Sequence, residues 1–251
     1  MVEALDAGVD GCELAAVSAK DKAKAERRLA NLRRQVPVVD IDALEPTADI
    51  VVECAPANLF SDIATPFLAA GKTVIALSSG ALLSNEHLIE LARDNGGQII
   101  VPSGAIVGLD AVSAAAQGRI HSVRMVTRKP VRGLSGAPYL VQSKIDIADI
   151  KEPLRVFSGT AREAASGFPA NLNVAVSLSL AGIGPDRTSL EIWADPSLDR
   201  NCHSIVVEAD SASLSMSISN VPSDNPKTGR ITALSVIACL RNMRAPLRVG
   251  A

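Results

Sequence analysis

Aromatic residues are scarce in this chain of 251 residues: they make up 2% of it, although hydrophobic residues make up 47%. The apolar residues are therefore mainly alanine, valine, isoleucine and leucine, a composition typical of α/β proteins with a buried parallel sheet. This apolar content excludes a disordered chain, because disordered chains lack the apolar area that offsets the entropy lost on ordering. The lack of aromatic side chains argues against binding of single-stranded nucleic acid by stacking.

Paired cysteines, long apolar runs and an excess of one charge are also missing. The four cysteines form no Cys-x-x-Cys pair, which argues against a zinc site and a disulfide framework. No apolar run reaches the roughly 18 residues of a membrane span, and the first residues do not resemble a secretory signal. The formal net charge of −2 does not favour a polyanionic partner. We therefore expect a soluble, cytoplasmic protein that binds no metal, nucleic acid or membrane.

The glycine-rich fingerprint G-x-G-x-x-G, which normally follows the first strand of a dinucleotide-binding domain, is absent as well. Residues 1–7 instead resemble the end of a helix capped by Gly8, which makes residues 14–17 the second strand of such a sheet. We expect the first strand and the phosphate-binding loop to be missing. Cofactor affinity should then be weak, because the pyrophosphate loses the helix N-terminus that usually holds it.

The first half of the chain alternates apolar runs with helical patterns, which predicts βαβ units and a parallel sheet. Ser84 is a candidate N-cap for the helix over 87–92, and Gly71 fits the end of the helix before it. The predicted strands lie at 14–18, 36–39, 50–54, 73–77 and 98–102. The predicted helices lie at 21–34, 66–70 and 87–92.

After about residue 120 the apolar residues alternate with polar ones, which predicts strands with one covered face. These strands lie at 122–127, 189–194, 204–208 and 213–219, and helices are predicted at 161–165, 171–180 and 232–241.

The expected fold class is α/β: an N-terminally incomplete Rossmann-type parallel sheet and a second α/β domain with a mixed or antiparallel sheet. The expected domains are 1–108 for the dinucleotide, 109–229 for catalysis and dimerisation, and a helix in 230–251 that returns to the first domain.

Small residues follow three predicted parallel strands, where ligands of open α/β sheets bind. Small side chains let a dinucleotide approach the backbone, although they are also ordinary in such turns. The three loops together predict a crevice for NAD or NADP. The candidate cofactor-binding residues in these loops are Ala55, Pro56, Ser78, Ser79, Gly80, Ser103, Gly104 and Ile106.

The end of the second strand leaves the choice between NAD and NADP open. Asp21 is available for a ribose 2′-hydroxyl, although it lies far along the chain from the strand. Ser18 and Lys20 are instead suited to a 2′-phosphate. A solvated, basic start of a helix explains the same residues without any ligand.

Six segments carry longer signatures: PSGAIVGLD at 102–110, GFPANLNVA at 167–175, AGIGPDRT at 181–188, ADP at 194–196, RNCH at 200–203 and NVPSDNPKTG at 220–229. This set closely resembles the L-aspartate dehydrogenase family, over the whole chain and most specifically in its second half.

The resemblance implies a Rossmann domain and an α/β domain that forms a homodimer. It also implies oxidation of L-aspartate to iminoaspartate with NAD or NADP, a step linked to pyridine nucleotide biosynthesis. His203 takes the place of the family's catalytic histidine, and Ala105 and Asn173 match cofactor-contacting positions.

The chemistry agrees with this placement of His203. Removing a hydride from an amine carbon first requires a deprotonated ammonium, so a base that titrates near neutrality helps. Of the three histidines, His203 lies in a polar, turn-like run that includes Asn201, which is placed to orient the imidazole. His87, on a predicted surface helix, and His121, just before a strand, fit structural or solvated roles.

A dicarboxylate substrate needs cationic or N–H partners at both ends. Lys227 and Thr228, with Asn225, lie in a loop rich in proline, asparagine and glycine, and we expect them to hold a substrate carboxylate or to order that loop. Arg128 and Lys129, at the end of a predicted strand, are second candidates. Surface charge on loops is the alternative explanation for each.

Two other functions remain open. One is a related two-domain oxidoreductase, similar to dihydrodipicolinate reductase or homoserine dehydrogenase, which a screen of amino-acid substrates would distinguish. The other is a truncated remnant that binds no cofactor, motivated by the missing fingerprint. The intact motifs of the second half argue instead for a misplaced start or a recent truncation, and a test of NAD binding would decide.

Overall fold

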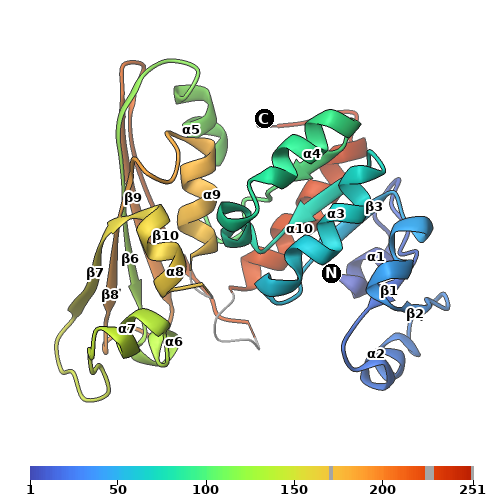
Figure 1. Cartoon of the computed structure of the whole chain (residues 1–251), viewed down its shortest axis with the longest axis horizontal. Coiled ribbons are helices and arrows are strands. Elements are labelled where there is room, and N and C mark those ends of the chain that lie inside the picture. Colours follow the sequence, from blue (N-terminus) through green and yellow to red (C-terminus); the bar gives the residue numbers. More distant parts are fainter. Residues whose placement is uncertain (170–171, 224–228, 250–251) are drawn as a thin grey trace. The chain divides into compact units, whose positions relative to one another are not determined.

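The computed structural model describes residues 1–169, 172–223 and 229–249 of the chain (Figure 1). The chain divides into two compact units. Unit 1 is Met1–Pro102 together with Ala233–Ala251, and unit 2 is Ser103–Thr232. The C-terminal segment therefore belongs to the same unit as the N-terminal half of the chain.

Unit 1 holds two pieces of parallel sheet. The strands β1 (Val17–Ser18) and β2 (Val38–Val39) pair with each other. The strands β3 (Ile50–Glu53), β4 (Thr73–Ala76) and β5 (Gln98–Ile100) form a second piece in the order β3-β4-β5. Within the residues that the structure describes, no strand pairing joins the two pieces. The parallel pairing confirms the class predicted for the first half, although β1 is shorter than the strand predicted at 14–18.

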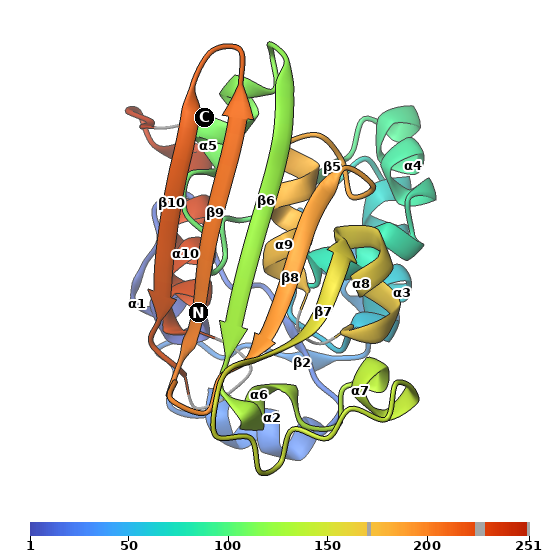
Figure 2. The ribbon, with the colours of Figure 1, turned by 90° about the vertical axis from the view of Figure 1, so that its left-hand side faces the viewer.

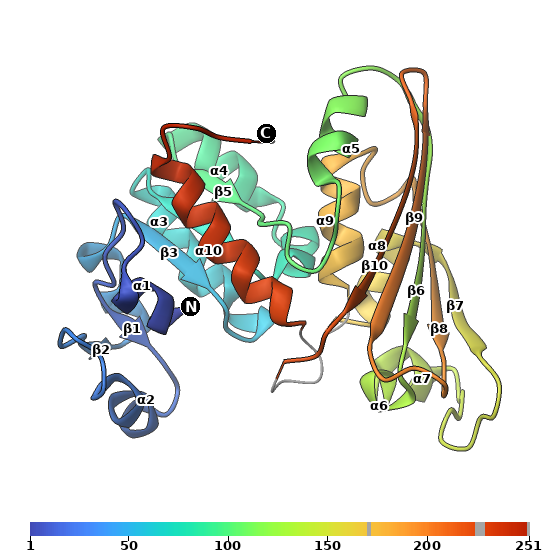
Figure 3. The same cartoon turned by 180° about the vertical axis from the view of Figure 1, so that it is seen from behind.

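Helices cover both faces of the three-stranded piece. Val74 and Ile75 are neighbours in β4, so their side chains point to opposite faces, and both are fully buried. Val74 packs with the helices α3 (Phe60–Ala69) and α4 (His87–Asn95), whereas Ile75 packs with Val236 and Leu240 of α10. Figure 3 shows α10 (Arg230–Arg244) running along this second face. Unit 1 therefore has the helix-covered parallel sheet of an α/β domain.

The remaining helices of unit 1 are short. They are α1 (Val2–Ala7), which ends at Gly8 as predicted, α2 (Lys22–Leu29) and the 3₁₀ segments Ile41–Ala43, Glu45–Thr47, Ala57–Leu59 and Ser79–Ser84. The prediction of Ser84 as the N-cap of α4 is wrong: its hydroxyl donates to the carbonyl of Ala81, and α4 begins three residues later. Gly71 follows α3 with a φ of 72°, where a Cβ would lie 2.7 Å from the carbonyl oxygen of Asn95.

Unit 2 is built on a five-stranded sheet in the order β10-β9-β6-β8-β7 (Figure 2). Strands β6 and β8 run parallel and all other neighbours are antiparallel, so the sheet is mixed, one of the two predicted forms. The strands are β6 (Ile120–Lys129), β7 (Leu154–Thr160), β8 (Thr188–Ala194), β9 (Asn201–Ala209) and β10 (Ser213–Asn220). The edge strand β7 was not predicted.

One face of this sheet is covered by helices, and the other faces away from them (Figure 2). The helices α5 (Leu109–Ala115), α8 (Ala161–Gly167) and α9 (Asn173–Ala181) lie on the covered side, and α6 (Val131–Leu134) and α7 (Pro138–Gln142) follow β6. The rings of Tyr139, Phe157 and Phe168 meet with centroids 5.3–5.7 Å apart and fill one end of this core. In the part of the chain that is described, no helix is long and apolar enough to cross a membrane.

Candidate functional site

A buried carboxylate ties together two of the predicted cofactor loops in unit 1. Glu53, the last residue of β3, is fully buried. Its Oε1 accepts hydrogen bonds from the backbone N–H of Ala55 at 2.9 Å and from the Ser78 hydroxyl at 3.0 Å, and its Oε2 accepts one from the backbone N–H of Ser78 at 2.9 Å. Burial raises the pKa of the Glu53 carboxyl, against the opposing effect of these hydrogen bonds. The segments after β3 and β4 therefore meet at the carboxyl edge of the sheet.

The other predicted residues of unit 1 lie around this connection. Pro56 follows Ala55 directly, and Ser79 and Gly80 begin the 3₁₀ segment after β4, with Ser79 buried. Asp21 caps α2, because its side chain accepts a hydrogen bond from the backbone N–H of Lys24 at 2.9 Å. Glu53 is not among the predicted site residues, although an acid at the end of a buried parallel strand can be recognised from the sequence.

The loop at 103–106 belongs to unit 2 and forms a tight turn. The backbone N–H of Ile106 donates to the carbonyl of Ser103 at 3.1 Å, and Gly104 has a φ of 59°, which glycine adopts readily. The carbonyl of Ala105 accepts a hydrogen bond from the Nδ2 of Asn220 at 3.2 Å. The Oδ1 of this buried asparagine has no hydrogen-bond partner among the described residues.

His203 lies in the interior of strand β9, where the sequence analysis expected a turn. It pairs with Thr127 of β6 and Ile218 of β10, and its side chain is only 3% exposed. Its Nδ1 lies 2.7 Å from the Oγ1 of Thr127, which leaves Nε2 as the nitrogen without a hydrogen bond from any described residue. The expectation of a turn is wrong, because β9 begins at Asn201 and already includes His203 as its third residue.

Burial also changes the ionisation of His203. It lowers the pKa of the imidazole from 6.5 to about 3, and the positive charge of Lys129 contributes in the same direction. The prediction of a histidine that titrates near neutrality is therefore wrong for the protein without ligands. The imidazole is neutral at physiological pH, which is the form that accepts a proton.

Lys129 is a buried cation on the same face of the sheet as His203. It is 3% exposed, and no described carboxylate pairs with it. Burial lowers the pKa of its ammonium to about 8. Arg128 differs, because it lies on the opposite face, 4.7 Å above the ring of Trp193, with its guanidinium 3.4 Å from the carboxylate of Asp195. Of the two second candidates for binding a carboxylate, Lys129 is the one without a counter-ion in the described part of the chain.

We refer to five side chains on this face as the covered polar patch: Thr127, Lys129, Asn201, His203 and Asn220. Asn201 and Asn220 are paired residues of β9 and β10, and Asn201 precedes His203 by two positions on the same face. A Cβ on Gly133 would lie 3.9 Å from the Oδ1 of Asn201 and 4.0 Å from the Cβ of Lys129, so these two side chains flank Gly133. A narrow hollow opens here, lined in part by Gly133, Asn201, Asn220, Pro222 and Gly229.

The remaining predicted residues fall into three groups. Asn225, Lys227 and Thr228 lie outside the described residues, although Pro222 and Gly229, on either side of them, pair with each other. Asn173 is the first residue of α9, in unit 2. His87 and His121 are both exposed.

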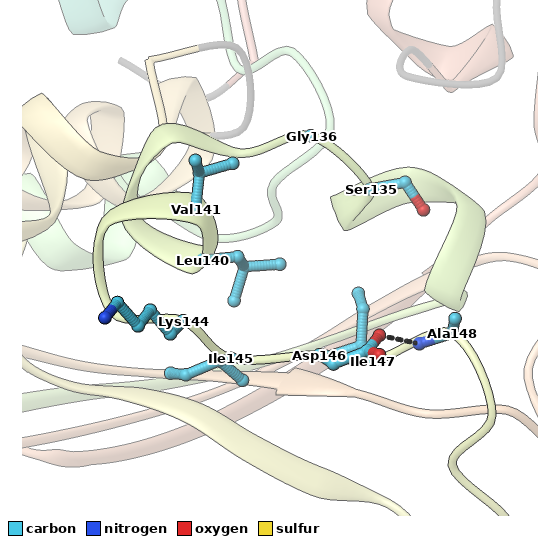
Figure 4. A pocket seen from close by; sticks show the side chains of 9 residues that line it. All are labelled: Ser135, Gly136, Leu140, Val141, Lys144, Ile145, Asp146, Ile147 and Ala148. Atoms are coloured by element: carbon cyan, nitrogen blue, oxygen red, sulfur yellow. Dashed lines mark hydrogen bonds between the residues drawn. The ribbon is translucent and has the colours of Figure 1, made fainter.

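A wider hollow elsewhere in unit 2 contains none of the predicted site residues. It lies between α6, α7 and the segment that follows, and Figure 4 shows Leu140 and Ile147 lining it together with Lys144. Asp146, also at this hollow, is occupied by a hydrogen bond from the backbone N–H of Ala148 at 2.9 Å. The hydroxyl of Ser135, at the same hollow, donates a hydrogen bond to the carbonyl of Val131 at 3.1 Å.

A parallel α/β unit with small-residue loops at its strand ends and a second unit with a buried histidine are features of the class of two-domain, dinucleotide-dependent oxidoreductases. Two family models match the chain. One, described as "Homoserine dehydrogenase, NAD binding domain", matches residues 1–102. The other, described as "Aspartate dehydrogenase, C-terminal", matches residues 110–243, which is more than half of the chain.

Named relatives agree with the second match. The L-aspartate dehydrogenase of Bradyrhizobium diazoefficiens is 61% identical over 98% of this chain and 88% of its own length. The L-aspartate dehydrogenase 3 of Bordetella bronchiseptica is 58% identical over 96% of this chain and 89% of its own length. The chain therefore belongs to the aspartate dehydrogenase family. The crystal structure of aspartate dehydrogenase from Thermotoga maritima has the same fold, with a TM-score of 0.70 at 24% identity over 92% of this chain and 96% of that one.

Replacing Glu53 with glutamine should destabilise unit 1. Each carboxylate oxygen accepts a backbone N–H, so either orientation of the amide turns its NH₂ group toward a donor. We expect the free energy of unfolding to fall by roughly 1–3 kcal/mol, measured by urea denaturation. Amide hydrogen exchange of Ala55 and Ser78 should become faster. Asp62→Asn, at an exposed acid of α3, is the control, and equal stability of the two variants would contradict the role of Glu53.

Replacing Lys129 with methionine, which has a similar length and no charge, should stabilise the protein. Because the pKa of Lys129 is about 8 in the folded chain and ordinarily 10.5, the folded chain binds fewer protons between these values, and stability rises with pH across this window. The cost of burying the charge is fully present below pH 8 and fades toward pH 10.5. We expect Lys129→Met to raise the free energy of unfolding by roughly 2–3 kcal/mol at pH 7 and by much less at pH 10.

Urea titrations at both pH values measure this difference. Lys151→Met, at an exposed lysine of unit 2, is the matched control and should change stability little at either pH. A loss of stability in Lys129→Met at pH 7 would mean that the ammonium has a stabilising partner.

Proposed function

We propose that the protein is an NAD(P)-dependent L-aspartate dehydrogenase that oxidises L-aspartate to iminoaspartate and so supplies pyridine nucleotide biosynthesis. The observation that carries this proposal is the neutral, buried imidazole of His203, held by Thr127 in the unit that matches the aspartate dehydrogenase C-terminal family. A neutral imidazole has a lone pair that can accept a proton from a substrate ammonium once a bound anion raises its pKa from about 3.

The residues present fit a dinucleotide. The loops tied by Glu53 place small residues at the carboxyl ends of β3 and β4, and Gly104 has no side chain that would keep a ligand from the backbone of its turn. The Oδ1 of Asn220, beside Ala105, has no partner among the described residues and is a buried acceptor that fits a donor group of a ligand. We assign cofactor binding to these loops and to Ala105 and Asn173. When bound, NAD(P) supplies the hydride acceptor.

His203 acts as the general base in this proposal. Its Nε2 takes a proton from the substrate ammonium, which leaves a neutral amine whose α-carbon then gives up a hydride to form the protonated imine. The hydrogen bond to Thr127 fixes the ring orientation. A dicarboxylate bound nearby adds negative charge, which raises the pKa of the imidazole and favours this transfer. The same base is suited to activate water for hydrolysis of the imine.

Substrate binding is assigned to Asn201 and to the loop that carries Asn225, Lys227 and Thr228. Asn201 lies on the same face as His203 and lines the narrow hollow. The ends of the loop, Pro222 and Gly229, line that hollow as well. This arrangement supports a loop that contributes cationic and amide groups toward a carboxylate.

A related oxidoreductase with another substrate is the second candidate, favoured by the match of residues 1–102 to the NAD-binding domain of homoserine dehydrogenase. A screen of L-aspartate, L-homoserine and other amino acids for NAD(P)H formation separates the two. Turnover confined to L-aspartate supports the first proposal. Calorimetric titration with NAD and NADP tests whether the chain binds a cofactor and which one it prefers.

A cytoplasmic location is also proposed. The four cysteines are free thiols in the described part of the chain, and thiols persist in reducing compartments. An L-aspartate dehydrogenase that feeds NAD synthesis uses substrates found in that compartment.

We propose further that the chain forms a homodimer through the face of the unit 2 sheet that is turned away from α8 and α9 (Figure 2). Val206 of β9 is 37% exposed on this face, and the ring of Trp193 lies between Arg128 and Arg155 there. A broad face with apolar residues among paired charges suits a symmetric interface.

Replacing His203 with alanine should lower kcat for L-aspartate by roughly 10²–10⁴-fold, the usual contribution of a general base. Steady-state NAD(P)H formation measures this loss, and calorimetry should show NAD(P) binding nearly unchanged. His121→Ala, at an exposed histidine of β6, is the control and should retain activity. An unchanged kcat in His203→Ala would exclude His203 as the base.

Replacing Val206 with arginine should dissociate the homodimer, because a symmetric interface uses the same face of both chains and would bury two guanidinium groups without partners. Light scattering after size exclusion should give about twice the chain mass of 26.1 kDa for the wild type and a single chain mass for the variant. Val141→Arg, at a valine of α7 that is 69% exposed, should stay dimeric. A monomeric wild type would overturn the proposal.

A further inference from the structure

Lys129 is the one charged side chain of the covered polar patch. Its neighbours there, Thr127, Asn201, His203 and Asn220, are neutral. The other buried charge described in unit 2 is Asp195, whose carboxylate accepts hydrogen bonds from the N–H and hydroxyl of Ser197 and pairs with Arg128 on the opposite face. Lys129 is therefore a buried ammonium that has no counter-ion among the described residues.

An isolated buried charge is costly, and proteins usually pair such a charge or use it to bind a ligand of opposite sign. Thr127 and Lys129 lie two positions apart in β6, so both point to the covered face, and the hydroxyl of Thr127 lies 2.7 Å from the imidazole of His203. A ligand that reaches the ammonium of Lys129 therefore comes close to the proposed base. The absence of a side chain at Gly133, between Lys129 and Asn201, leaves room beside both.

We propose that Lys129 binds a carboxylate of the substrate beside His203 and thereby selects dicarboxylates over amino acids with neutral side chains. The inference rests on the proposed function, because it concerns the same site. The carboxylate accepts hydrogen bonds from the ammonium, and the amide of Asn201 is on the same face to donate to its second oxygen. The carboxylate also offsets the positive charge that opposes protonation of His203.

Binding of succinate, a dicarboxylate without an amino group to oxidise, tests the inference apart from catalysis. Calorimetry of the full chain, with and without NAD, should show wild-type binding, at least tenfold weaker binding in Lys129→Met, and partial recovery in Lys129→Arg. Lys151→Met, at an exposed lysine of the same unit, should bind as the wild type does. Equal succinate binding by the wild type and Lys129→Met, or no binding by the wild type in either condition, overturns the inference.

Steady-state kinetics separate this inference from the proposed function. Lys129→Met should raise KM for L-aspartate at least tenfold with a smaller effect on kcat, because the lost contact is present before the chemical step. An unchanged KM in an active enzyme overturns the role of Lys129 and leaves the proposed function standing. Succinate binding that depends on Lys129, in a wild type that oxidises no L-aspartate, supports the anion site and overturns the proposed function.

Discussion

The exclusion of water from the covered face of the unit 2 sheet is the constraint on which the chemistry of this protein depends. The alternation that buries Val123 and Met125 in β6 continues along the strand and also buries Thr127 and Lys129. The same burial lowers the proton affinity of both Lys129 and His203. An imidazole on the other face of the strand would be solvated and would lack this environment. Burial on the covered face of the sheet therefore both packs the strand and lowers the pKa of the proposed base.

The two units place buried polar groups at strand ends but satisfy them differently. In unit 1 the carboxylate of Glu53 receives three hydrogen bonds from the chain itself, so its requirements are met and it fastens two loops. In unit 2 the ammonium of Lys129 has no counter-ion, and the Oδ1 of Asn220 has no partner among the described residues. Since buried polar groups are nearly always paired, the satisfied carboxylate of Glu53 fits a structural role, whereas unsatisfied groups leave a place for a ligand, an ion or a water molecule.

The elements that could be predicted are those with a strong local pattern. The continuous apolar runs of β3 and β4 and the alternation of β8 located these strands within a residue or two. Strand β7 was missed because it is an edge strand whose polar and apolar residues do not alternate cleanly, with a register shift between Arg155 and Phe157. Edge strands bury less, so their sequences carry a weaker signal.

The site shows where prediction from sequence ends. His203 was identified by resemblance, but its surroundings depend on Thr127, 76 residues away along the chain, and no local pattern contains that pairing. Lys129 and its neighbour Arg128 are an intermediate case. The alternation of side chains along β6, starting from the apolar Val123 and Met125, predicts that Lys129 is buried and that Arg128 is exposed. Alternation cannot show that no described carboxylate pairs with Lys129, because that depends on every strand and helix that meets this face. The charge that the fold leaves unpaired is therefore the part of the site that only the three-dimensional structure reveals.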